Sequence, residues 1–206
     1  ETDDDPRFYK DMVEYHDKVI GKLVDYLDEQ GIREDTLIIY LGDNGTPTDV
    51  CSVMHGHNEI CGGKGKTNDR GTHVPLICNM PGTIPQATVQ SDLVDCTDYL
   101  PTIFEAAGLE LPKGYLIDGR SFYPQLTGKK GNPRDWIFFH FEPMSVRNDT
   151  DQIRFVRNHK WKLYETGELY DMTCDLDENS PIFESQDDKQ QAEARNTLGT
   201  VFGTMV

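Results

Sequence analysis

Apolar residues in the first thirty positions recur every three or four residues, with Asp and Lys filling the positions between them. This spacing predicts an amphipathic helix over residues 6–30. Asp5 suits the N-cap, Pro6 suits the first turn, and Gly31 is a stop signal. The apolar positions that define the main face are Tyr9, Val13, Ile20, Val24 and Leu27.

A predicted strand, residues 36–41, follows the helix after a short linker, and its residues 37–41 form an unbroken apolar segment. Such a segment is typical of a central strand that is covered on both faces, so helix and strand together indicate half of a βαβ unit. Residues 42–73 then form a long connection rich in Gly, Asn and Thr, and connections of this length without secondary structure of their own are usually functional or disordered. Residues 74–78 predict a short strand, with Pro75 at the start or edge of its sheet.

Residues 97–107 again show helical spacing, and Gly108 directly after them predicts the end of this helix. Residues 109–134 are rich in loop-forming glycines. Beyond them, four short segments rich in β-branched and aromatic residues predict an antiparallel meander. A polar terminal helix is expected at residues 186–198. The four predicted strands are residues 135–141, 152–157, 160–165 and 168–172.

The pattern as a whole predicts an α/β fold followed by a small antiparallel sheet with a terminal helix. The change from mixed helix and strand patterns to short β-rich segments falls at residues 128–135. We therefore expect one domain over residues 1–130 and a second over residues 131–206. A sheet interrupted at its edge exposes unpaired strand groups, which favours self-association of the chain.

Net charge narrows the classes of partner. The 206 residues carry 20 Lys and Arg against 36 Asp and Glu, a net charge of −16. This balance argues against nucleic acid and anionic membranes, which bind basic surfaces. No apolar segment approaches the roughly 18 residues of a membrane span. An anionic substrate would need local positive charge, and residues 51–75 supply Lys64, Lys66 and Arg70, although this number is close to average.

The five cysteines lack the C-x-x-C spacing of zinc and redox motifs. Their odd number implies at least one free thiol or a partner outside the chain. Cys51 and Cys61 could pair across the long connection, but spacing alone leaves this open. Cys78 and Cys96 stand among apolar residues and are expected to be core cysteines.

Asp43 and Asn44 directly follow the apolar strand, and ligands of open α/β sheets bind beyond the carboxyl ends of strands. Their side chains offer hard oxygen donors, which suit Ca²⁺, or less readily Mg²⁺, better than Zn²⁺. Gly42 and Gly45 allow the backbone to turn both side chains toward one ion. Two donors are too few for a calcium site, so further ligands must come from elsewhere. The alternative is that Asp-Asn-Gly is simply a turn.

Lys64 stands among glycines in Gly62-Gly63-Lys64-Gly65, where its ammonium group could reach the oxyanion of an ester. The alternative is a solvated lysine on a flexible surface loop. His55 and His57 could bind substrate or metal, or could simply be exposed.

Four ordered motifs resemble the sulfatase family of the alkaline-phosphatase superfamily. The first is the strand that ends in Gly42-Asp43-Asn44-Gly45, and the second is the pattern G-K-G-x-T-x-[DE]-x-G-x-x-x-P from Gly63 to Pro75. Lys64 lies 20 positions after Asn44, similar to the spacing between the metal-binding Asp-Asn pair and the sulfate-contacting lysine of the family. Residues 92–108 and 153–171 resemble the later segments.

The resemblance implies part of an alkaline-phosphatase-like sheet flanked by helices, in a sulfuric ester hydrolase. It implies that Asp43 and Asn44 bind Ca²⁺ and that Lys64 is a catalytic, sulfate-binding residue. His57, singled out by residue type alone, is a weaker candidate for substrate binding. Arg70 and His73 depart from the family pattern, in which many members have Gly and Arg. By the same resemblance the protein would be periplasmic, secreted or lysosomal, and its substrate a sulfate ester such as a sulfated carbohydrate.

Sulfatases use a formylglycine made from C-x-P-x-R or S-x-P-x-R, and neither motif occurs in these 206 residues. We therefore expect the chain to be a C-terminal portion that is inactive alone, with formylglycine in the N-terminal half. The alternatives are a phosphoryl or phosphonate ester hydrolase of the same superfamily, and a non-catalytic binding module. Asn148 begins an N-glycosylation sequon, which matters only in a eukaryotic secretory context.

Overall fold

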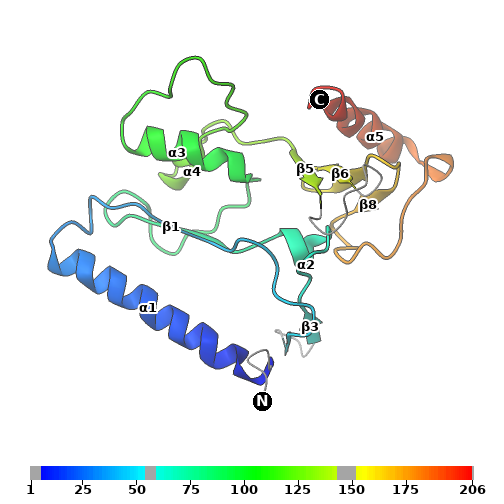
Figure 1. Cartoon of the computed structure of the whole chain (residues 1–206). Coiled ribbons are helices and arrows are strands. Elements are labelled where there is room, and N and C mark those ends of the chain that lie inside the picture. Colours follow the sequence, from blue (N-terminus) through cyan, green and yellow to red (C-terminus); the bar gives the residue numbers. More distant parts are fainter. Residues whose placement is uncertain (1–5, 54–58, 143–151, 206) are drawn as a thin grey trace. The chain divides into compact units, whose positions relative to one another are not determined.

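The computed structural model describes residues 6–53, 59–142 and 152–205 (Figure 1). The chain divides into two compact units, Glu1–Thr88 and Val89–Val206. The expected boundary between residues 1–130 and 131–206 concerns the domains of the intact protein and stays a prediction. Among the described residues, no helix has the length and apolar content needed to cross a bilayer.

The first unit begins with a short 3₁₀ turn, η1 (Pro6–Phe8), that continues into helix α1 (Tyr9–Glu29). Gly31 ends the helix as expected: its φ is +67°, and its amide donates to the carbonyl oxygen of Asp28 at 3.0 Å. Only glycine adopts this conformation without strain, which is why the helix stops here. The N-cap expected at Asp5 lies outside the described residues.

Strand β1 (Ile38–Leu41) pairs antiparallel with β4 (Leu76–Asn79), which starts directly after Pro75 as predicted. Helix α1 lies along this pair (Figure 1): the Tyr9 hydroxyl is 3.3 Å from Thr46 Oγ1. All four residues of β1 are only half-buried. The prediction of a strand covered on both faces is therefore wrong for the described chain, because a two-stranded sheet and one helix shield it incompletely.

Helix α1 carries a second apolar stripe, which the described residues leave uncovered. No residue of α1 is buried. The half-buried positions lie on the face toward β1, whereas the second stripe is 44–66% exposed. An exposed apolar surface at helical spacing is typical of a contact face. The residues of this outer stripe are Met12, Tyr15, Val19, Leu23 and Tyr26.

The connection between β1 and β4 has secondary structure that the sequence did not reveal. A small hairpin of β2 (Cys51–Val53) and β3 (Glu59–Cys61) is closed by the Cys51–Cys61 disulfide. A single helical turn, α2 (Asp69–Thr72), follows. The long connection at residues 42–73 therefore has secondary structure of its own. Three-residue strands and a four-residue helix are too short to produce a readable period.

The second unit starts with η2 (Cys96–Asp98) and α3 (Tyr99–Ala106), which confirm the helix predicted over residues 97–107, and continues to the one-turn helix α4 (Tyr123–Leu126). Cys96 is exposed, so its expected place in a core is wrong: it occupies the first turn of η2. Cys78, in the first unit, is half-buried, and burial raises the pKa of its thiol to about 11.

The buried carboxylate of Asp98, which is 1% exposed, joins three segments of the second unit. Arg134 donates to both of its oxygens, from Nε and Nη2, at 2.6–2.9 Å. The backbone amides of Asp95 and Arg120 donate at 2.8 and 2.6 Å. A buried charge is tolerated only when it is paired and hydrogen-bonded in this way.

The predicted meander is confirmed as a four-stranded antiparallel sheet of order β5-β6-β7-β8. The terminal helix α5 (Lys189–Phe202) packs on it (Figure 1), with Asp188 as N-cap. The buried core between them comprises Val156, Trp161, Leu163, Leu169, Ala194, Leu198 and Val201. The strands are β5 (Ile137–Phe141), β6 (Ile153–Arg157), β7 (Trp161–Tyr164) and β8 (Leu169–Asp171).

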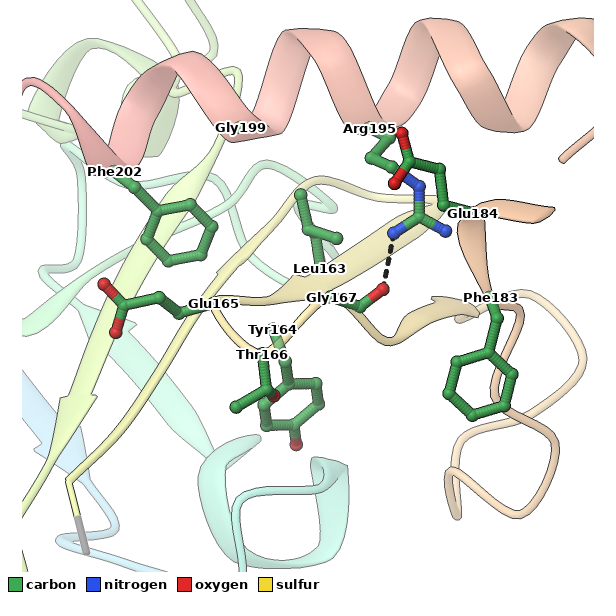
Figure 2. Close-up of a pocket in the computed structure, with 10 residues that line it drawn as sticks. All are labelled: Leu163, Tyr164, Glu165, Thr166, Gly167, Phe183, Glu184, Arg195, Gly199 and Phe202. Atoms are coloured by element: carbon green, nitrogen blue, oxygen red, sulfur yellow. Dashed lines mark hydrogen bonds between the residues drawn. The ribbon is translucent and has the colours of Figure 1, made fainter. Parts of the chain in front are cut away.

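Two further polar contacts hold this unit together. Arg195 of α5 donates to the Gly167 carbonyl at 2.5 Å, as Figure 2 shows, and pairs with Asp187 at 2.8 Å. The fully buried Lys162 pairs with Glu178 at 2.6 Å and lies 3.7 Å from the centre of the Phe155 ring. Arg195 thus ties α5 to the turn between β7 and β8, and Lys162 ties β7 to the segment that precedes α5.

Candidate functional site

The turn that carries Asp43 and Asn44 is fixed at both of its ends. The amide of Gly42 donates to the Pro75 carbonyl and that of Gly45 to the Gly71 carbonyl, both at 3.0 Å. The Asn44 amide donates to Asp43 Oδ1 at 2.9 Å. Both side chains are exposed at the carboxyl end of β1. The turn is thus a rigid support for two solvent-facing oxygen donors.

The Lys64 loop runs beside this turn. The Lys64 amide donates to the Thr46 carbonyl at 2.9 Å, and the Gly62 amide donates to the Val50 carbonyl at 3.0 Å. Lys64 itself is exposed. The structure therefore brings together the two segments that the sequence singled out. The convergence of the Lys64 ammonium group with Asp43 and Asn44 stays a prediction, since the contact is between backbones.

Glycines allow these segments to approach so closely. A Cβ atom at Gly45 would lie 2.1 Å from the Arg70 carbonyl oxygen, and one at Gly63 would lie 2.5 Å from Arg70 Cβ. A Cβ at Gly71 would lie 2.0 Å from the Lys66 carbonyl oxygen. Real Cβ atoms cannot occupy such positions, so glycine is required at all three. What reads in the sequence as a flexible loop is a closely packed one.

Of the two departures from the sulfatase pattern, Arg70 takes part in this packing and His73 does not. Arg70 Nη1 donates to the Cys61 carbonyl at 3.2 Å, which ties α2 to the end of the hairpin. His73 is exposed, and its Nδ1 lies 3.5 Å from Asp69 Oδ2. His55 and His57, the other candidates from sequence, lie outside the described residues.

The oxygen donors at this turn fit part of a calcium site. A carboxylate and an amide oxygen are ligands that Ca²⁺ prefers, and they lie exposed on a fixed turn. The described part of the chain holds no group of three or more His, Cys, Asp or Glu residues that could bind a metal. Asp43 and Asn44 therefore suit a ligand set that other residues must complete.

A hollow of about 380 Å³ in the second unit is less suited to an anionic ester (Figure 2). Its cation, Arg195, already donates to Asp187, Gly167 and Ile182. Glu165 and Glu184 add negative charge to its lining. The Lys64 loop thus remains the better candidate for anion recognition.

Comparison with known proteins gives a consistent result. A family model described as "Sulfatase" matches residues 3–109, and one described as "N-sulphoglucosamine sulphohydrolase, C-terminal" matches residues 64–201. Steryl-sulfatase of Mus musculus is 31% identical over 138 residues, which cover 65% of this chain and 22% of the relative. A sulfatase of Formosa agariphila is 29% identical over 215 residues, which cover 90% of this chain and 38% of the relative.

The fold has close counterparts among solved structures. The structure of BT4656 in complex with its substrate, D-glucosamine-2-N,6-O-disulfate, matches with a TM-score of 0.71 and 25% identity. The match covers 90% of this chain and 37% of that one. Across these relatives the chain spans between 22% and 38% of their length.

Proposed function

Because the chain belongs to the sulfatase family, we propose that the protein in which it occurs is a sulfuric ester hydrolase. The observation that carries the proposal is the hydrogen bond from the Lys64 amide to the Thr46 carbonyl at 2.9 Å. It holds the only lysine of the Gly62–Gly65 loop next to the turn that presents Asp43 and Asn44.

In this proposal Lys64 binds the sulfate group. Its ammonium group is a compact donor that offsets the negative charge developing on the ester oxygens in the transition state. The flanking glycines keep bulk away from the anion. The protein has a strong negative net charge, so this local cation is what makes an anionic substrate acceptable.

Asp43 and Asn44 would hold Ca²⁺ through their side-chain oxygens, with further ligands from outside the described residues. When bound, the ion supplies Lewis-acid polarisation of sulfate oxygens. The chain's own contribution is to fix the orientation of the two donors through the amides of Gly42 and Gly45, which are bonded to Pro75 and Gly71.

The nucleophile is proposed to be a formylglycine that these 206 residues do not encode, since they contain neither C-x-P-x-R nor S-x-P-x-R. The 206-residue chain alone is accordingly proposed to hydrolyse no ester. For the substrate we propose a sulfated carbohydrate. The support is the match to the N-sulphoglucosamine sulphohydrolase model over residues 64–201 and the likeness to BT4656 bound to a glucosamine disulfate.

The test is to express a polypeptide that joins this chain to its natural upstream sequence, and to measure sulfate release by ion chromatography. The substrates are an aryl sulfate, a sulfated glucosamine, and the matching aryl phosphate. Sulfate release that exceeds phosphate release supports the proposal. Faster phosphate release would instead favour the phosphoryl-hydrolase alternative, and turnover by the 206-residue chain alone would refute the proposed need for an external nucleophile.

A further inference from the structure

We propose that the Cys51–Cys61 disulfide and Arg70 form a brace that positions the Lys64 loop. The inference rests on the proposed function, because it assigns these residues a role in presenting the sulfate-binding lysine. They are positioning residues: none of them needs to touch the substrate.

Cys61 is held from two directions. Its sulfur is bonded to Cys51, its direct partner in the antiparallel register of β2 and β3. Its carbonyl oxygen accepts a hydrogen bond from Arg70 Nη1 at 3.2 Å. The next residue, Gly62, donates its amide to Val50 at 3.0 Å. The residue that begins the loop is thus anchored to the hairpin and to α2 at the same time.

The loop needs such an anchor because its own sequence gives it little rigidity. Two consecutive glycines, Gly62 and Gly63, separate Cys61 from Lys64, and glycine has the largest backbone freedom of any residue. Both lie against neighbouring backbone, since Cβ atoms there would lie 2.1 Å from the Thr46 carbonyl oxygen and 2.7 Å from the Arg70 carbonyl carbon. The close fit exists only while the hairpin and α2 stay in place.

The consequence for Lys64 is geometric. A lysine has a long flexible side chain, so the placement of its ammonium group depends on how well its Cα is fixed. Electrostatic stabilisation of a transition state requires donors that are already in position. A disulfide between β2 and β3 with a guanidinium contact from α2 supplies this from outside the loop. The brace therefore serves anion recognition rather than global stability alone.

Amide hydrogen exchange on the 206-residue chain tests the brace directly. The oxidised protein is compared with the Cys51→Ser/Cys61→Ser double variant, and Cys174→Ser, which removes an exposed thiol in the second unit, is the control. We expect exchange at the Gly62 and Lys64 amides to become at least about tenfold faster in the double variant. The Gly42 amide and helix α5 should be unaffected. Unchanged exchange at Lys64 would overturn the proposal.

Arg70 gives an independent test that leaves the disulfide intact, in case the double variant fails to fold. Arg70→Ala should accelerate exchange at Lys64, and Arg70→Lys should restore only part of the protection, because lysine lacks the planar fork of arginine. Equal protection in the wild type and Arg70→Ala would refute the role of Arg70.

In the full-length enzyme, both brace variants should lower kcat for an aryl sulfate more than they raise KM, because Lys64 acts on charge that develops in the transition state. This readout separates the two proposals. If only the functional proposal is wrong, the variants still show faster amide exchange, but the full-length protein shows no sulfatase turnover. If only the brace proposal is wrong, both brace variants keep the turnover of the wild type, and that turnover still depends on Lys64.

Discussion

The Lys64 amide donates its hydrogen to the carbonyl oxygen of Thr46, two residues beyond Asn44 in the chain, at 2.9 Å. This bond joins segments that are 18 positions apart in sequence (64 − 46) and that carry the three proposed site residues. It does so through the backbone, so it survives any change of the lysine side chain. Side-chain substitutions at Lys64 therefore test chemistry with little effect on the loop.

The first prediction concerns this lysine. In the full-length enzyme, Lys64→Ala should lower kcat/KM for an aryl sulfate by about 10²–10³, the usual cost of removing one oxyanion donor. Lys66→Ala is the matched control, since Lys66 is also exposed and lies just after the Gly62–Gly65 loop. Steady-state sulfate release measures both. An equal loss in the two variants would mean that the loop acts through its overall charge.

The second prediction concerns the metal. Removing divalent ions with a chelator should abolish sulfatase activity. Ca²⁺ should restore it better than Mg²⁺, because Ca²⁺ accepts an irregular oxygen ligand set drawn from separate segments, whereas Mg²⁺ demands near-ideal octahedral geometry. Asp43→Ala should weaken Ca²⁺ binding by at least the ~10–100-fold that loss of an outer partner costs. Calorimetric titration measures it. Asp49→Ala, at another exposed carboxylate of the same connection, should bind Ca²⁺ as the wild type does.

The third prediction contrasts the same substitution at two glycines of the first unit. Gly63→Ala places a Cβ 2.5 Å from Arg70 Cβ and 2.7 Å from the Arg70 carbonyl carbon, so the backbone must shift at a cost of roughly 1–3 kcal/mol. Gly21→Ala meets nothing within 4 Å in the middle of α1. It should stabilise the helix by roughly 0.5–1 kcal/mol. Urea unfolding of both variants would show opposite signs; matching signs would contradict the packing described here.

The fourth prediction concerns acid. The hydrogen bond from Arg195 holds the pKa of Asp187 below its ordinary value. A carboxylate whose pKa is lower in the folded state than in the unfolded state stabilises the folded protein. This stabilisation is complete above the unfolded-state pKa, which is about 3.9. It is lost as the pH falls through the folded-state pKa. The second unit should therefore lose stability below about pH 4. Urea unfolding between pH 3 and 7 should show a weaker loss for Asp187→Asn, whereas Glu193→Gln, at an exposed carboxylate of α5, should follow the wild type.

The fifth prediction concerns association. The outer stripe of α1, and the edges of the β1–β4 pair that the described residues leave unpaired, are surfaces that a second copy can cover. Sedimentation velocity of the 206-residue chain should show a concentration-dependent dimer. Met12→Glu with Val19→Lys should shift it toward monomer, while Lys18→Glu, which leaves the apolar stripe intact, should not. A strictly monomeric wild type would refute this prediction.

Sequence reasoning found the elements whose period is long enough to read. The 21 residues of α1, the strands of the meander and the terminal helix were all predicted, because packing selects a regular apolar face in each. Asp43, Asn44 and Lys64 were singled out by residue type and spacing, and the structure places their segments side by side.

The parts that were missed depend on contacts between distant residues. The pairing of Cys51 with Cys61 was open because spacing cannot fix connectivity. The contact of Arg70 with Cys61 requires α2 to stand beside the hairpin, which no local pattern indicates. The burial of β1 was predicted wrongly, and the strand is only half-buried. An apolar segment shows that a strand is able to be buried, but the described residues provide too few neighbouring elements to cover it.

The carboxylate of Asp98 has an implication for the order in which the chain acquires its shape. During translation, Asp98 is added to the chain 22 positions before Arg120 and 36 positions before Arg134. A growing polypeptide that ends before Arg120 holds an ionised group with neither of these distant donors, so α3 can complete its packing only after residue 134 has been synthesised.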